Sequence, residues 1–261
     1  MASERIERMA VEVEGEGPAV IMLHGLGGSS NTFTPQMGVF AGRYRSIRPD
    51  LPGSARSPLP RSLSMDLIVE RILAMAAALG VERAHFLGHS LGTILCQRIA
   101  VRAPKLVASL ALFGPLTEPP GPARTALEAR AKLAKEGGEA AMTEIADAIV
   151  KAATASATKE RQPVVLAAVR ESLMRQSGEG YGATCAALAV AVAADASQIT
   201  CPTLLVTGED DVVAPPSVTR GLAEKISGAR AHVLPRCGHW TTFEAAEEVN
   251  RLLKDFMSMQ R

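Results

Sequence analysis

The stretch "AHFLGHSLGTILCQRIA", residues 84–100, decides the fold of this chain. An apolar segment at 84–88 runs into Gly88-His89-Ser90-Leu91-Gly92, and a segment with helical spacing of apolar residues follows over 91–102. A serine between two glycines at such a strand-to-helix junction matches the G-x-S-x-G pattern, in which the serine hydroxyl projects from a sharp turn. Ser90 is therefore a candidate nucleophile. The alternative is that Ser90 only caps the helix in a tight turn.

The same alternation of strand and helix continues along most of the chain. Strands are predicted at 18–25, within 44–50, at 84–88, at 106–114, at 202–207 and at 229–235. Helices are predicted at 64–80, 91–102, 217–227 and 243–258. This order is typical of parallel βαβ units, so we expect an α/β fold with a mostly parallel sheet flanked by helices.

The interval 116–197 interrupts this rhythm. It has no convincing strand, and it offers four helical stretches, at 122–136, 139–153, 160–176 and 180–194. So much helix is too long for one crossover between neighbouring strands. We therefore predict a core made of residues 1–115 and 198–261 and an inserted helical cap of residues 116–197. The alternative is a set of ordinary crossover helices.

A serine hydroxyl needs a base before it can act as a nucleophile. In this kind of fold the chain order is serine, acid, histidine, and His239 lies in a loop between the last predicted strand and the last helix. Asp211 follows the strand at 202–207 and is the favoured acid, while its neighbours Glu209 and Asp210 are interpreted as solvated loop carboxylates. Asp211 would hold the imidazole of His239 in the correct tautomer.

The reaction also needs N–H donors for the oxyanion. One is expected on the residue after the nucleophile, which is Leu91, and the other in the loop after an early strand. That loop is "HGLGGSS", residues 24–30, and Leu26 is the candidate for the second backbone N–H. The alternative, a phosphate-binding turn, lacks both the G-x-G-x-x-G spacing and a Walker lysine.

Composition excludes several other classes of function. The net charge is +1 and aromatic residues make up 3% of the chain, which does not support nucleic-acid binding. No secretory signal or membrane-spanning run is visible, so we expect a cytoplasmic protein that does not enter a membrane. The four cysteines are far apart and show no metal-binding spacing, so no metal site is predicted. The oligomeric state stays open.

Five short motifs occur in a shared order over most of the chain. They are His24-Gly25-x-Gly27, Asp50-Leu51-Pro52-Gly53 with Ser57, Gly88-x-Ser90-x-Gly92, Gly208-x-x-Asp211 and Gly238-His239-Trp240. With them the sequence resembles the α/β-hydrolase superfamily with a helical cap inserted after the sixth strand. The strings "GYGATCAAL", "CPTLLVTGEDDVVAPPS" and "CGHWTTFE" look like the 3-oxoadipate enol-lactonase group. One departure is Ala55, which stands where the second glycine of the loop after the second strand is usual.

This resemblance implies a serine hydrolase that cleaves a small-molecule ester or lactone through an acyl-enzyme, without a metal or organic cofactor. It also implies a substrate pocket near the triad, for which His24, Gly25, His89 and Trp240 are candidates. The alternatives are a structural role for the two histidines and packing under the last helix for Trp240. Four arginines of the predicted cap could bind a substrate carboxylate, although a solvated helix face is the favoured position of each: Arg124, Arg130, Arg170 and Arg175. Two alternatives remain, namely a carbon–carbon bond hydrolase with the same triad and a ligand receptor without enzymatic activity on the same fold.

Overall fold

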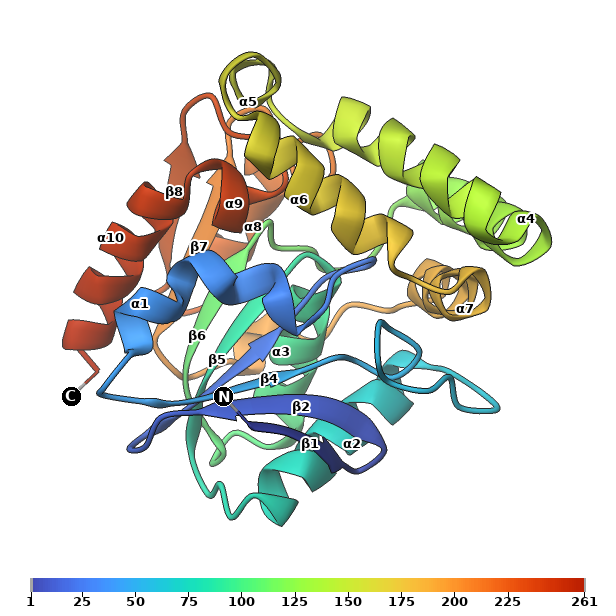
Figure 1. Ribbon diagram of the computed structural model, residues 1–261. Coiled ribbons are helices and arrows are strands. Elements are labelled where there is room, and N and C mark those ends of the chain that lie inside the picture. The colour runs from blue at the N-terminus through green and yellow to red at the C-terminus, as the bar shows by residue number, and fades with distance from the viewer. Residues whose placement is uncertain (1, 261) are drawn as a thin grey trace.

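A single eight-stranded sheet forms the centre of the protein in the computed structural model, which describes residues 2–260 (Figure 1). The order across the sheet is β1-β2-β4-β3-β5-β6-β7-β8. All pairs from β4 to β8 are parallel, while β1 and β2 are antiparallel to their neighbours. The strands are β1 (Ala2–Ile6), β2 (Met9–Glu14), β3 (Ala19–Leu23), β4 (Arg45–Pro49), β5 (Ala84–His89), β6 (Val107–Phe113), β7 (Thr203–Gly208) and β8 (Arg230–Leu234). The predicted mostly parallel α/β sheet is confirmed.

The sequence patterns did not predict the hairpin of β1 and β2. Its two-residue turn is Glu7-Arg8, and both residues have positive φ, 49° and 64°. Such a turn is usually signalled by Asn-Gly or Asp-Gly, because those residues tolerate the left-handed region. The charged residues of this turn give no such signal, and the alternation Val11-Glu12-Val13-Glu14 in β2 is short.

Helices cover both faces of the sheet. Successive side chains of a strand point to opposite sides, so each face carries apolar residues that pack against helices. On β3, Val20 and Met22 pack with α1 and α10, whereas Ile21 and Leu23 pack with α2 and α3. The helices of these layers are α1 (Met37–Phe40), α2 (Met65–Ala78), α3 (Leu91–Arg102), α8 (Pro216–Lys225), α9 (Thr241–Glu244) and α10 (Ala246–Ser258). In residues 2–260 no helix has both the length and the apolar character to cross a membrane.

Four further helices lie between β6 and β7 in the chain and gather along one side of the molecule (Figure 1). They are α4 (Gly121–Ala153), α5 (Ser156–Arg161), α6 (Pro163–Met174) and α7 (Gly178–Ala189). The non-helical backbone of Gly138, with φ of 55°, breaks α4 where the sequence places two separate helices. The boundaries of the predicted core and cap stay a prediction.

Two helix boundaries differ from those predicted for 160–176 and 180–194. The first region is divided before Pro163, which begins α6 because proline suits the first turn of a helix but not its interior. The second helix ends early, at Ala189. The guanidinium of Arg124 donates hydrogen bonds to the carbonyls of Ala189 and Ala191, at 2.9 and 3.2 Å, which satisfies acceptors at the end of the helix.

Helix α7 contacts the loop after β4 so closely that one position has no room for a side chain. A Cβ on Gly180 would lie 2.1 Å from the carbonyl oxygen of Gly53. Gly180→Ala is therefore expected to lower the melting temperature measured by calorimetry, although alanine normally stabilises a helix by up to about 1 kcal/mol. Gly221→Ala in α8 is the matched control, because a Cβ there meets no atom within 4 Å. We expect this control to raise the melting temperature slightly. Equal shifts in the two variants would contradict the close contact.

Candidate active site

Ser90 occupies the sharp turn between β5 and α3. Its backbone has φ of 53° and ψ of −118°, a region that non-glycine residues rarely adopt. The turn brings α3 against the end of β3, where a Cβ on Gly92 would lie 2.1 Å from the carbonyl oxygen of Leu23. Only glycine fits there. The backbone N–H of Ser90 donates to the carbonyl of Phe113 at 2.9 Å, which ties the turn to the end of β6.

The structure brings Ser90, His239 and Asp211 together although they come from three separate strand ends. The Nε2 atom of His239 lies 2.8 Å from Ser90 Oγ. On the other side of the ring, Nδ1 lies 2.9 Å from Asp211 Oδ2 and 3.1 Å from Oδ1. With Nδ1–H donating to the carboxylate, Nε2 is free to accept the proton of the serine hydroxyl. This is the geometry that a serine nucleophile and its general base require.

Asp211 is buried, but its surroundings favour the ionised carboxylate. Burial alone would raise the pKa of its carboxyl. The charge of His239 and hydrogen bonds from His239 and from the backbone N–H groups of Ala214 and Val213 outweigh burial, so the pKa lies below its usual value. These two amides donate to Oδ1 at 2.7 and 2.9 Å. By contrast, Glu209 and Asp210 are exposed, as the sequence indicates.

The loop after β3 forms a tight turn beside Ser90. The N–H of Gly28 donates to the carbonyl of Gly25 at 3.0 Å, and a Cβ on Gly25 would lie 2.9 Å from Ser90 Cβ. Leu26 therefore lies in a turn directly beside the serine, and its side chain lines the adjoining cavity. Leu91 is the first residue of α3, where the backbone N–H has no partner within the helix. Leu26 and Leu91 thus both adjoin Ser90, and the role of their backbone N–H groups as oxyanion donors stays a prediction.

His24, Gly25 and His89 lie behind the cavity and are not among the residues that line it. His24 is 1% exposed. Its Nε2 accepts a hydrogen bond from Leu51 N–H at 2.9 Å, so Nδ1 carries the proton and donates to the carbonyl of Gly25 at 2.8 Å. This neutral ring joins the loops after β3 and β4, and its burial lowers its pKa.

His89 supports the loop that carries His239. Its Nε2–H donates to the carbonyl of His239 at 2.9 Å, and its ring lies 5.1 and 5.2 Å from the rings of His239 and Trp240. Burial, together with the charge of His239, lowers the pKa of His89 to about 3. The ring is therefore neutral, and its proton is committed to the carbonyl of His239.

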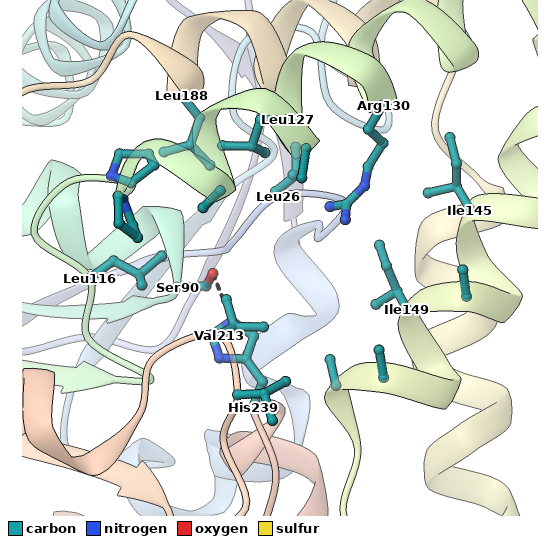
Figure 2. A pocket seen from close by; sticks show the side chains of 18 of the residues that line it. Leu26, Ser90, Leu116, Leu127, Arg130, Ile145, Ile149, Leu188, Val213 and His239 are labelled. Carbon is teal, nitrogen blue, oxygen red and sulfur yellow. Dashed lines mark hydrogen bonds between the residues drawn. The ribbon is translucent and has the colours of Figure 1, made fainter.

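A cavity of about 730 Å³ opens above the Ser90 hydroxyl, between the sheet and the helices α4 and α7 (Figure 2). This volume suits a small organic molecule. Its wall is largely apolar, with Leu26, Leu116, Leu127, Ile145, Ile149, Leu188 and Val213 among the lining residues. Of the predicted pocket residues, Trp240 lines this cavity beside His239. Within residues 2–260 no three His, Cys, Asp or Glu side chains are grouped so that they could hold a metal ion.

One of the four arginines singled out from the sequence lines the cavity. Arg130 extends from α4, and Figure 2 shows its guanidinium pointing into the space above Ser90. Arg170 and Arg175 instead form exposed ion pairs with Asp147 and Glu171. Arg124, as described above, binds the end of α7. Spacing on a helix does not reveal which face meets the cavity, so the sequence could not distinguish these four.

Two buried residues of the site region were missed by sequence reasoning. Gln176, just after α6, donates to the carbonyls of Gly27 and Gly28 at 3.3 and 3.1 Å and so holds the turn beside Ser90. Glu244, at the end of α9, accepts hydrogen bonds from the backbone around His239. Gln176 acts through partners that are distant in the sequence, and Glu244 also binds two distant residues, Ala155 and Thr158. The only signal for Glu244 was its place in the string "CGHWTTFE".

Comparison with known proteins agrees with this geometry. Residues 18–246 match the family described as alpha/beta hydrolase fold. The chain belongs to the alpha/beta hydrolase fold family. A relative from Variovorax paradoxus (strain S110), named as a carbamate hydrolase, RutD, is 30% identical, and the match covers 95% of each chain.

Two solved structures also match this chain over almost its full length. The enol-lactonase from Burkholderia xenovorans LB400 is 26% identical with a TM-score of 0.90, and the match covers 98% of this chain and 100% of that one. A thermophilic esterase from Thermogutta terrifontis has a TM-score of 0.91 at 22% identity, covering 100% and 99% of the two chains. The latter likeness shows the fold alone. The family, the relative from Variovorax paradoxus and the enol-lactonase structure support a hydrolytic enzyme.

The buried neutral histidine beside the candidate base makes stability depend on pH. Because the pKa of His89 is about 3 in the folded state, below the ordinary histidine value of 6.5, the unfolded state binds the proton first. The stabilising effect of the neutral His89 ring is complete above pH 6.5 and is lost as the pH falls toward 3. The expected loss of unfolding free energy by pH 5 is about 2 kcal/mol. Urea unfolding between pH 5 and pH 7.5 should therefore show a shallower pH dependence in His89→Gln, which keeps the N–H donor. Identical slopes would contradict the neutral, buried assignment.

Proposed function

We propose that this alpha/beta hydrolase is a serine hydrolase that cleaves a small-molecule ester or lactone through an acyl-enzyme intermediate. The observation that carries the proposal is the 2.8 Å contact between Ser90 Oγ and His239 Nε2 at the base of the apolar cavity. The similarity to the Burkholderia xenovorans enol-lactonase supports the lactone part of the proposal.

The proposed reaction has two stages. Ser90 Oγ attacks the substrate carbonyl while His239 Nε2 takes its proton, and Asp211 stabilises the imidazolium that forms. The backbone N–H groups of Leu26 and Leu91 receive the oxyanion of the tetrahedral intermediate. His239 then gives its proton to the leaving oxygen, and an acyl-enzyme remains on Ser90. In the second stage His239 takes a proton from water, which attacks the acyl carbon. The bond from that carbon to Ser90 Oγ then breaks, His239 returns its proton to Oγ, and the acid is released.

The carbamate hydrolase name of the 30% identical relative favours a second candidate substrate class. A carbamate offers the same carbonyl carbon to Ser90 and would follow the same two stages. Its nitrogen donates electrons into the carbonyl, so it is the less reactive substrate. A panel of esters, lactones and carbamates, with the products of each measured by chromatography, separates the two classes. Cleavage of carbamates alone would replace the ester and lactone proposal.

Removing the nucleophile or the base is expected to abolish turnover. With 4-nitrophenyl acetate, the wild-type protein should show a burst of nitrophenolate, and Ser90→Ala should lack it. Both Ser90→Ala and His239→Ala are expected to lower kcat by at least about 10⁴-fold, because the two groups act as a unit. Ser217→Ala is the control, since Ser217 is exposed at the start of α8. Near-native activity of His239→Ala would disprove the proposed mechanism.

Arg130 is expected to favour substrates with a carboxylate distant from the scissile carbonyl. A charged hydrogen bond in an apolar cavity contributes about 1.5–3 kcal/mol, or roughly 10- to 100-fold in kcat/KM. Monomethyl adipate and methyl hexanoate are the matched anionic and neutral esters, and Arg130→Met should lower kcat/KM only for the first. Arg170→Met, which removes an exposed ion pair with Asp147, is the control. An unchanged ratio between the two esters in Arg130→Met would exclude this role.

A further inference from the structure

Glu244 is a buried carboxylate without a cationic partner among residues 2–260. It ends α9, five residues after His239, and is 7% exposed. Instead of an ion pair, its two oxygens accept four hydrogen bonds. Oε2 accepts from the N–H of Ala155 at 2.8 Å, from the hydroxyl of Thr158 at 2.7 Å and from the N–H of Gly238 at 3.1 Å. Oε1 accepts from the N–H of Trp240 at 3.0 Å.

These bonds account for the backbone donors on both sides of His239. The N–H groups of Gly238 and Trp240 donate to Glu244, and the N–H of His239 donates to the carbonyl of Ala153 at 2.9 Å. Three successive amides thus have fixed partners. Because an unpaired buried amide costs on the order of 1–3 kcal/mol, the loop that carries His239 has no other conformation of similar energy while these partners stay in place.

The hydrogen bonds reach one helix of the cavity wall and the segment that follows it. Ala153 ends α4 and lines the cavity, and Ala155 and Thr158 lie immediately beyond it and in α5. The approach is close enough that position 238 must be glycine. A Cβ on Gly238 would lie 2.8 Å from the carbonyl oxygen of Ala153, from the backbone nitrogen of Ala155 and from Glu244 Oε1. The histidine loop and this end of the cavity wall therefore contact each other through backbone atoms.

We propose that Glu244 is a positioning residue that joins the His239 loop and the segment Ala153–Thr158 into one rigid unit. The proposal rests on the proposed function, in which His239 is the base. His89 holds the carbonyl of His239 and Ala153 holds its N–H, while Glu244 holds the amides of the two neighbouring residues. Loss of the carboxylate would leave the Ser90–His239 contact with the same side chains but with fewer hydrogen bonds to fix the backbone beside His239.

The experiment compares Glu244→Gln, Thr158→Val and the control Ser109→Ala. Glu244→Gln keeps the shape of the side chain, but its amide N–H₂ group then faces the donors that bind one of the two carboxylate oxygens. Thr158→Val removes one hydrogen bond to Oε2 and keeps the charge. Ser109→Ala also removes a buried hydrogen bond, the 2.8 Å contact with His85 Nδ1 near the opposite end of the parallel strands.

Two measurements are made on each full-length variant. Steady-state hydrolysis of 4-nitrophenyl acetate gives kcat and KM separately. Proton NMR with ¹⁵N-labelled histidine observes the low-field imidazole N–H of His239 that is bonded to Asp211, and it needs no substrate. We expect Glu244→Gln to lower kcat roughly 10- to 100-fold with little change in KM, because a displacement of about 1 Å is enough for such a loss. It should also shift or broaden the imidazole signal. Thr158→Val should show smaller changes of the same kind.

The outcomes separate this proposal from the proposed function. Wild-type kcat and an unchanged imidazole signal in both Glu244→Gln and Thr158→Val, with only a lower melting temperature, would overturn the positioning role. The same would follow if Ser109→Ala lowered kcat as much. If the wild-type protein cleaves no ester, the proposed function fails, while the imidazole signal still decides the role of Glu244. If Glu244→Gln does not fold, Thr158→Val decides it.

Discussion

The arrangement of the site depends on one steric constraint: α3 begins so close to the end of β3 that position 92 has room only for a hydrogen atom. This contact forces the chain to reverse sharply at Ser90, which adopts φ of 53° as a result. The cost of that backbone conformation is on the order of 1–3 kcal/mol, and neighbouring contacts must supply it. One of them is the hydrogen bond from Ser90 N–H to the end of β6. The serine is thereby held at the edge where the loops after β3, β6 and β7 meet.

Two buried carboxylates act on His239 in different ways. Asp211 binds the imidazole and is satisfied by the amides of residues 213 and 214, so its charge is directed at the ring. Glu244 binds the backbone on either side of the ring. In a site with little water, electrostatic interactions are stronger than in solvent, and an unpaired polar group is correspondingly costly. A complete set of hydrogen bonds around His239 is therefore needed for the ring to stay between Ser90 and Asp211.

The residues around the site differ in how far the sequence could predict them. Ser90, Asp211 and His239 each follow a recognisable strand in a short motif, and parallel strands bring such ends to one edge. The direction in which His24 and His89 point depends on carbonyls of other residues. The sequence therefore left open whether they line the pocket or have a structural role, and in the structure they lie behind the cavity. The position of Arg130 in the cavity wall depends on how α4 packs, and the role of Glu244 depends on partners 86 and 89 residues away in the sequence.

The β1–β2 hairpin could not be predicted for a local reason, since its turn contains neither glycine nor asparagine. The left-handed backbone at Ala55 was equally hard to predict, because this alanine has φ of 47° at a position where related loops have glycine.

We expect the few charged side chains in the otherwise apolar cavity wall to have the most influence on which substrate binds. Burial of apolar surface stabilises a bound molecule by about 25 cal/mol per Å², whether it is an ester, a lactone or a carbamate. In the proposed mechanism the attack by Ser90 on the carbonyl carbon is also common to the three, so neither the apolar wall nor the reacting groups would discriminate strongly among them. Three charged side chains line the cavity apart from those that contact Ser90: Glu118, Arg130 and Glu144. Glu118 is paired with Arg124 at 3.5 Å, and Glu144 is exposed on α4. Arg130 is therefore the lining charge best placed to distinguish substrates by the group that they carry far from the carbonyl.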